Sequence, residues 1–97
     1  MLHDNLYKVI SIDENRVVIK LSDKEHPLFK AHFPDMPLLP GFINFDIVEK
    51  LFKIKITTIK RAKFLKPALP DQVLTYERKN NSFKVLNENG IVASFSL

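Results

Sequence analysis

The strongest constraint on the fold of this chain is its one stretch of helical periodicity, which is apolar on most of its sides. Large apolar residues recur there at the three- and four-residue spacing of a helix, namely Phe42, Ile43, Phe45, Ile47, Val48, Leu51 and Phe52. The spacing predicts a single helix from about Gly41 to Phe52, whose polar positions are Asn44, Asp46, Glu49 and Lys50. A helix with so few polar positions must be largely enclosed by the rest of the chain.

Short segments rich in β-branched residues lie on both sides of this helix. The pattern predicts six strands, over residues 6–12, 16–21, 54–64, 72–78, 82–86 and 91–97. Turn residues separate them, including Asn80-Asn81 and Asn89-Gly90. A chain of 97 residues has room for one domain, here residues 1–97. We therefore expect an α+β domain in which a curled antiparallel sheet of five to six strands wraps one central helix, the arrangement called the hot-dog fold.

Four prolines crowd the segment between the second strand and the helix, at Pro27, Pro34, Pro37 and Pro40. A proline has no backbone donor and biases the residue before it away from the helical region. We therefore expect residues 24–41 to form an ordered, extended loop without regular structure. Its apolar side chains predict that the loop packs against the domain, and ordered loops of this length are often functional.

Several classes of protein and site are excluded by composition. The chain has no cysteine, so it can form neither a disulfide framework nor a thiolate metal site. Its three histidines, His3, His26 and His32, lack metal-ligand spacing, and we predict no metal. Neither a signal peptide nor a membrane span is recognisable in the sequence, so we expect a cytoplasmic protein.

Positive charge is concentrated in one segment of the chain. Between Lys50 and Lys66 there are basic residues and no acidic ones, within a net charge of +4. Such a segment predicts an anionic partner, although a lysine-rich strand edge that discourages aggregation is an equally simple interpretation. Nucleic acid is the weaker prediction, because aromatic residues are not interleaved with the basic ones as stacking on bases requires.

Residues 25–46, EHPLFKAHFPDMPLLPGFINFD, carry two closely spaced motifs. His32-Phe33-Pro34 is followed by Pro37-Leu38-Leu39-Pro40-Gly41, and then by Asp46 on the predicted helix. With these motifs in this order, the chain resembles the β-hydroxyacyl-acyl-carrier-protein dehydratases and their hot-dog relatives. A second stretch, 61–72, is similar to the segment that follows the helix in that family.

The resemblance implies a function and a set of site residues. It implies elimination of water from a 3-hydroxyacyl thioester on a phosphopantetheine arm, to give the trans-2-enoyl thioester. His32 would be the base and Asp46 the acid, with Glu49 as the reserve acid. The remaining implied substrate-binding residues are Phe33, Pro40, Gly41 and Phe42, and the Gly41 N–H would face the thioester oxygen. No cofactor is implied beyond the pantetheine of the carrier.

The chemistry of these residue types agrees with those roles. An imidazole titrates near neutral pH and suits proton abstraction, and a carboxylic acid in an apolar site can protonate a departing hydroxyl. A helix N-terminus offers unpaired N–H groups to an oxygen on which negative charge develops. Each residue also has a purely structural interpretation: His32 could order its loop, and Asp46 could be a surface residue of the helix.

The resemblance also implies partners. Acyl carrier proteins are acidic, and we expect Lys55, Arg61 and Lys63 to share one side of the 54–64 strand and to bind the carrier. The family implies a homodimer with the site at its interface, possibly within a higher oligomer. Differences from the family pattern at Ala31, Asp35 and Leu69 leave two alternatives: a non-catalytic module that binds acyl carriers, and a hot-dog acyl thioesterase.

Overall fold

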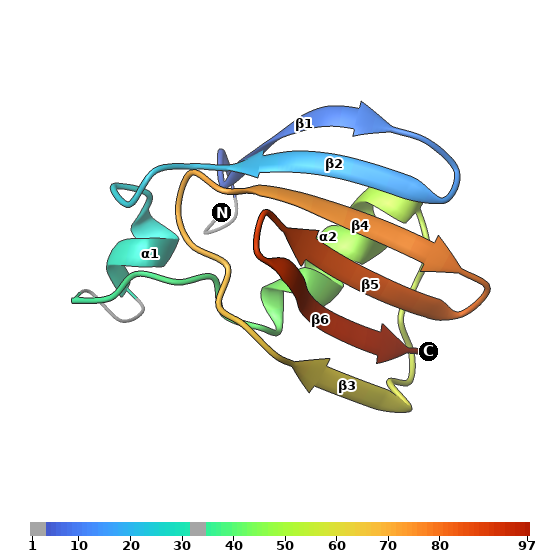
Figure 1. Ribbon diagram of the computed structural model, residues 1–97. Coiled ribbons are helices and arrows are strands. Elements are labelled where there is room, and N and C mark those ends of the chain that lie inside the picture. Colours follow the sequence, from blue (N-terminus) through green and yellow to red (C-terminus); the bar gives the residue numbers. More distant parts are fainter. Residues whose placement is uncertain (1–3, 32–34) are drawn as a thin grey trace.

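The computed structural model describes residues 4–31 and 35–97 as one antiparallel sheet with a helix across one of its faces (Figure 1). The strands are β1 Tyr7–Ile12, β2 Arg16–Leu21, β3 Arg61–Phe64, β4 Val73–Lys79, β5 Ser82–Asn87 and β6 Gly90–Ser96. The helices are α1 Pro27–Ala31 and α2 Ile43–Phe52. The six predicted strands and the predicted central helix are confirmed.

The strand order of the sheet is β1-β2-β4-β5-β6-β3, and every neighbouring pair is antiparallel. β1 and β3 are therefore the two edges. The chain leaves β2 through α1, passes along α2, and returns at the far edge as β3 before β4 inserts beside β2 (Figure 1). This route places the start of α2 next to β3 and the segment that follows it, which matters for the site described below.

An aromatic cluster joins α2 to the sheet. The rings of Phe45 and Phe95 lie edge to face at 4.9 Å, as do those of Phe52 and Phe83 at 5.2 Å, and Phe83 stacks on Phe95 at 5.3 Å. These geometries are among those that aromatic pairs prefer. The buried face of the helix is completed by Ile43, Ile47 and Val48.

The prediction that α2 is largely enclosed is only partly correct. Phe42, directly before the helix, is 57% exposed, and Asp46 is also exposed. The sheet lies on one side of the helix, so the opposite side is left open within a single chain.

The prediction that residues 24–41 contain no regular structure is wrong, because they include the one-turn helix α1. Pro27 is its first residue, where a missing N–H and a fixed φ are tolerated. The buried His26 ring caps the turn, since its Nδ1 accepts the Leu28 N–H at 3.0 Å and its Nε2 therefore donates to the Asp4 carbonyl at 2.7 Å. The expected packing of this segment is confirmed by buried Leu28, Phe29 and Leu39.

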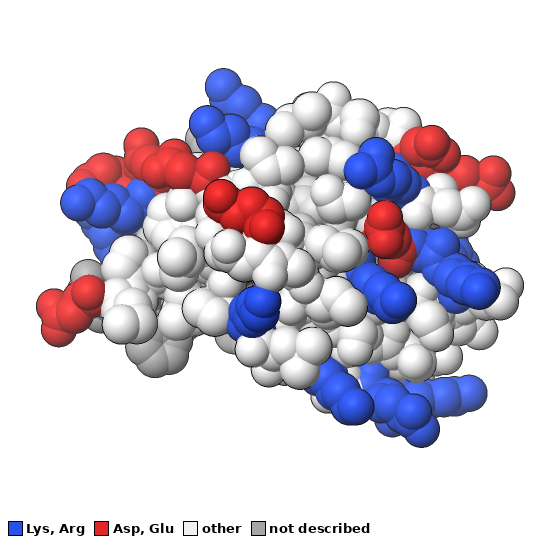
Figure 2. Space-filling model, viewed as in Figure 1, with Lys and Arg blue, Asp and Glu red and all other residues white. Residues whose placement is uncertain are grey.

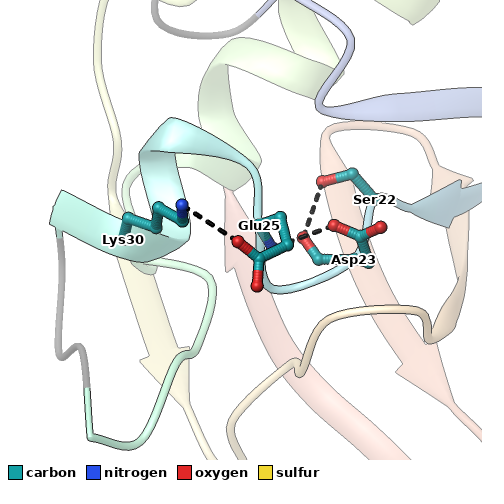
Figure 3. A network of polar contacts seen from close by, with 4 residues as sticks. All are labelled: Ser22, Asp23, Glu25 and Lys30. Carbon is teal, nitrogen blue, oxygen red and sulfur yellow. Dashed lines mark hydrogen bonds and ion pairs between the residues drawn. The ribbon is translucent and has the colours of Figure 1, made fainter.

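A small polar network shapes the approach to α1 (Figure 3). The Asp23 carboxylate accepts the Glu25 N–H at 2.9 Å, and the Ser22 hydroxyl donates to the Asp23 carbonyl at 3.4 Å. The Glu25 carboxylate lies 2.9 Å from the Lys30 ammonium across the turn. All four residues are at the surface, so the network orders the chain locally and contributes little to overall stability.

The strand predicted over residues 54–64 is much shorter, and only β3, Arg61–Phe64, is a strand. Residues 54–59 pair with no strand in the described chain, and the contact with β6 begins at Lys60, whose N–H binds the Ser96 carbonyl at 3.0 Å. Instead the backbone N–H groups of Ile54 and Ile56 are bound by the Glu49 carbonyl at 3.1 Å and the Glu49 carboxylate at 2.8 Å. β3 is an edge strand, and all four of its residues are exposed.

The last two hairpins differ in how well their turns were predicted. Asn80-Asn81 connects β4 to β5 as expected, with Asn80 in the left-handed conformation at φ 55°. The next turn is Glu88-Asn89, one residue before the predicted Asn89-Gly90. The Asn87 side chain accepts the Asn89 N–H at 2.8 Å and starts the turn early, so Gly90 becomes the first residue of β6.

Candidate active site

An apolar groove of about 650 Å³ lies at the start of α2. Its walls come from two segments that the topology brings together, the chain that enters α2 and the chain that leaves β3. The residues that line it are Leu38, Leu39, Pro40, Gly41, Phe42, Asn44, Phe64, Leu65, Lys66, Pro67, Ala68 and Val92. A hydrogen bond from the Leu39 N–H to the Ala68 carbonyl, at 2.8 Å, holds the two segments together. The groove therefore includes three of the predicted substrate-binding residues, Pro40, Gly41 and Phe42.

The first turn of the helix leaves backbone donors free at this groove. The N–H groups of Ile43, Asn44 and Phe45 bind the carbonyls of residues 40, 41 and 42, at 3.0 to 3.1 Å. Within residues 4–31 and 35–97, no acceptor lies opposite the N–H of Gly41 or of Phe42. Such unpaired donors, together with the positive end of the helix dipole, favour an oxygen that carries negative charge.

Gly41 is required at this position by the ring of Phe64. A Cβ added to Gly41 would lie 2.8 Å from Phe64 Cε1 and 2.9 Å from Phe64 Cδ1. Gly41 does not have the positive φ that would itself exclude alanine. The need for glycine here is therefore steric, and it is imposed by a residue of β3.

Because of this contact, we expect the effect of Gly41→Ala on the unfolding free energy to change sign when Phe64 is replaced. In the native protein we expect Gly41→Ala to cost ~1–3 kcal/mol of unfolding free energy, because the added methyl overpacks against Phe64. In a Phe64→Ala background the clash is gone, and the same substitution should be neutral or stabilising, because alanine lowers the entropy of the unfolded chain. Denaturant unfolding of the four proteins measures the cycle, and equal costs in both backgrounds would contradict it.

Asp46 lies in a different groove, of about 600 Å³, on the side of α2 that faces β1. This groove is lined by Asp4, Asn5, Leu6, Tyr7, Val9, Ile43, Asp46, Ile47, Lys50 and Leu51. Asp46 is exposed within the single chain, one turn before the exposed Lys50. The structure thus brings Pro40, Gly41 and Phe42 together and places Asp46 apart from them on the same helix.

Glu49, the reserve acid, has a structural partner. Its carboxylate accepts the Ile56 N–H at 2.8 Å and its carbonyl accepts the Ile54 N–H, so it fixes the segment that follows α2. The Glu49 carboxylate is therefore engaged with the backbone of its own chain. His32 and Phe33 lie outside the described residues, so their roles stay predictions.

Sequence reasoning missed a buried polar pair behind the helix start. The Tyr76 hydroxyl of β4 donates to Asn44 Oδ1 at 2.6 Å, and the Asn44 amide donates to the Gly41 carbonyl at 3.1 Å. Asn44 is 2% exposed and Tyr76 is fully buried. The available signal was the place of Asn44 in the sequence, because it directly follows Ile43 and lies three and four residues before Ile47 and Val48, on the buried face of the helix.

Burial of Tyr76 gives the stability of the protein a pH dependence. Desolvation, with a smaller contribution from the nearby Tyr7, raises the pKa of Tyr76 well above its ordinary value of 10.0. Above pH 10 the unfolded chain releases this proton while the folded chain keeps it, so the free energy of unfolding falls as the pH rises. The difference in unfolding free energy between wild type and Tyr76→Phe should therefore shrink by up to ~1.4 kcal/mol per pH unit above pH 10. Urea titrations from pH 8 to 11 measure it, and a constant difference would contradict the assignment.

The predicted carrier-binding residues are at the surface, and they do not share one strand. Arg61 and Lys63 alternate along β3, whereas Lys55 lies before it in the segment without strand partners. Lys and Arg side chains gather along the lower edge of the molecule, where β3 runs (Figure 2). The surface along β3 is basic, and strand alternation does not join Lys55 to Arg61 and Lys63.

Within the described residues, no helix is long and apolar enough to cross a membrane, since even α2 has only 10 residues. Residues 4–31 and 35–97 also hold no group of three or more His, Cys, Asp or Glu side chains arranged for a metal ion.

Comparison with known proteins places these features in a family. The model of the family described as ApeI-like, ApeI dehydratase, matches residues 9–95. A protein of Bradyrhizobium sp. (strain ORS 278) named 3-hydroxyacyl-[acyl-carrier-protein] dehydratase FabZ is 27% identical over 88 residues, which are 75% of this chain and 58% of that protein. The protein of the same name from Roseobacter denitrificans is 29% identical over 84 residues, covering 69% and 55% of the two chains. The chain thus spans less than two thirds of the length of these relatives.

Solved structures support the same fold. The dehydratase heterocomplex ApeI:P from Xenorhabdus doucetiae matches with a TM-score of 0.68 and 21% identity, over 92% of this chain and 93% of that one. The E. coli PaaI protein from the phenylacetic acid degradation operon matches with a TM-score of 0.59 and 17% identity, over 97% and 82%. At these identities the likeness shows the fold, and the predicted hot-dog architecture is confirmed.

Proposed function

Because this chain belongs to the ApeI-like dehydratase family, we propose that it removes water from a 3-hydroxyacyl thioester to give the trans-2-enoyl thioester. We propose that the acyl group is carried on the phosphopantetheine arm of an acyl carrier protein, as the names of the FabZ relatives state for those proteins. The observation that carries the proposal is the helix start at Gly41, where unpaired N–H groups open onto an apolar groove.

The proposed reaction is a β-elimination. The His32 imidazole takes the proton from the carbon next to the thioester carbonyl, and the electron pair of that C–H bond forms the new C=C bond. The bond from the next carbon to its hydroxyl breaks, and the hydroxyl leaves as water with a proton from the Asp46 carboxyl group. One proton is taken and one is given, so the reaction needs no oxidant, metal or other cofactor.

The helix start has the arrangement that this reaction requires. Removal of the proton builds negative charge on the thioester oxygen, and donors fixed in advance lower the barrier without having to reorganise. The N–H groups of Gly41 and Phe42 are such donors. The apolar walls of the groove suit an acyl chain.

We further propose that the site is completed by a second copy of the chain. Asp46 and Gly41 open onto different grooves of one chain, and this separation supports a site whose acid and thioester-binding N–H groups come from two protomers. Large apolar side chains near the helix start, Phe42, Phe64 and Leu65, are 51–58% exposed in the single chain and suit an interface. The basic surface with Lys55, Arg61 and Lys63 is proposed for the acidic carrier. The cytoplasmic location and the exclusion of nucleic acid stay predictions.

The decisive test is mass spectrometry of 3-hydroxyacyl carrier proteins incubated with the purified protein. We expect a product lighter by one water. Because general acid–base catalysis contributes ~10²–10⁴-fold, His32→Ala should lower the rate by about that factor. A wild-type protein that neither dehydrates hydroxyacyl thioesters nor hydrates enoyl thioesters would contradict the proposal.

The same experiment separates the two alternatives. Release of free thiol without an enoyl product would indicate a thioesterase. Binding of the carrier without any change in acyl mass, and no effect of His32→Ala, would indicate a non-catalytic module. Light scattering on the same sample measures the assembly, and the mass of a single chain would contradict the shared site.

A further inference from the structure

A continuous series of hydrogen bonds crosses the core from the sheet to the start of α2. Tyr76, in the middle of β4, donates to Asn44, and Asn44 donates to the carbonyl of Gly41. No buried side-chain nitrogen or oxygen in the described residues lacks a partner. A buried polar network is costly when any member is unsatisfied, so one that is fully satisfied specifies a single arrangement.

Two hydrogen bonds from Asn44 converge on one peptide group. The Gly41 carbonyl accepts the Asn44 backbone N–H at 3.1 Å and the Asn44 side-chain amide at 3.1 Å. The peptide between Gly41 and Phe42 is trans, so its N–H points away from the direction of its carbonyl. Holding the carbonyl toward the helix interior therefore aims the Phe42 N–H backward, to the side from which the chain enters α2.

The two hydrogen bonds are needed to fix this peptide group, because Gly41 has no side chain that could restrict its backbone. Glycine has the widest conformational freedom of any residue, and the neighbouring Phe42 is largely exposed. A carbonyl that accepts two hydrogen bonds also becomes more polarised, which strengthens the N–H of the same peptide as a donor. Orientation and donor strength at the groove thus both depend on Asn44.

We propose that Asn44 and Tyr76 are positioning residues that hold the Gly41–Phe42 peptide with its N–H aimed at the thioester oxygen. The inference rests on the proposed function. It explains what aims the Phe42 N–H and gives a role to two residues that touch no substrate. Tyr76 suits this role because it lies at the centre of the sheet, where it pairs with Val17 and Val85. Tyr76 thereby anchors Asn44 to the most rigid part of the fold.

The test uses Tyr76→Phe, Asn44→Leu and the double variant, which are close to the native residues in size. Each single variant leaves one buried polar group unpaired and should lose stability, whereas the double variant replaces both partners by apolar groups and should recover much of it. A purely structural role predicts that activity recovers with stability. A positioning role predicts that kcat stays low in all three, by at least about tenfold and below the roughly 10²–10³-fold cost of removing a whole oxyanion donor. KM should change little.

A second measurement follows the peptide itself. The chain contains only two glycines, Gly41 and Gly90, so their amide signals in an ¹⁵N spectrum are readily told apart from the others and from each other by mutation. We expect the Gly41 and Phe42 signals to broaden in all three variants while Gly90 is unchanged. The control is Asn87→Ala, which removes two side-chain bonds away from the helix start, to Gln72 at 3.0 Å and to the Asn89 N–H at 2.8 Å, and should leave both kcat and the Gly41 signal as in wild type.

The outcomes distinguish this inference from the function on which it rests. An active wild type with a double variant of normal kcat would overturn the positioning role and leave the proposed function standing. Unchanged Gly41 and Phe42 signals in the three variants would also overturn it. A wild type that is inactive on every hydroxyacyl and enoyl thioester would overturn the proposed function and this inference together.

Discussion

Asp46→Asn is expected to slow dehydration by about 10²–10⁴-fold, the usual contribution of a general acid. Asparagine has nearly the size of aspartic acid but cannot give a proton to the leaving hydroxyl. Because Asp46 is exposed within the chain, the substitution should leave the fold intact. Single-turnover rates on a 3-hydroxyacyl carrier protein measure the effect, and circular dichroism checks the fold.

The matched control for this variant is Glu49→Gln, one turn further along α2. The glutamine carbonyl oxygen can still accept the Ile56 N–H that the Glu49 carboxylate binds at 2.8 Å. We therefore expect the control to keep both its stability and its rate. If Glu49→Gln abolishes activity and Asp46→Asn does not, Glu49 is the acid and the assignment of Asp46 is wrong.

Phe83→Ala is expected to have the largest effect on stability, a loss of about 3–5 kcal/mol. Phe83 is 1% exposed, stacks on Phe95 and meets Phe52 of α2 edge to face, so its removal opens a cavity between the helix and the sheet. A domain of this size has only about 5–15 kcal/mol of stability in total. The variant should therefore lose a large share of the stability of the domain.

Urea unfolding of Phe83→Ala beside Ile10→Ala tests this expectation. Ile10 is also large and apolar, but it is 56% exposed at the bulge of the edge strand β1. Its substitution should change the unfolding free energy by no more than about 0.5 kcal/mol. A similar loss in both variants would mean that the aromatic cluster is not what holds α2 to the sheet.

The fold was predictable from the sequence where one local rule decided the structure. The period of Phe42 to Phe52 predicted α2, and β-branched runs between turn residues predicted all six strands. The errors arose where two rules competed. Pro27 was interpreted as a helix breaker, although at the first position of α1 it starts a helix. Residues 54–59 have strand composition, but no strand of the described chain pairs with them.

Only the part of the candidate site that lies within the motifs of residues 25–46 was predictable from the sequence. Pro40, Gly41 and Phe42 were expected to act together, and they line one groove. The link from Asn44 to Tyr76 could not be found, because it joins residues 32 positions apart and depends on which strand lies behind the helix. The contact of Phe64 with Gly41 could not be predicted either, because it depends on the position of β3 at the edge of the sheet.

The ring of Phe64, which packs on Gly41, is 51% exposed in a single chain and belongs to β3, which has a strand neighbour on one side only within residues 4–31 and 35–97. If the proposed second copy binds along that edge, it holds the ring in place against the helix start. Turnover per chain should then fall when the protein is diluted below the dissociation constant of the assembly, so that activity would depend on the concentration of the chain.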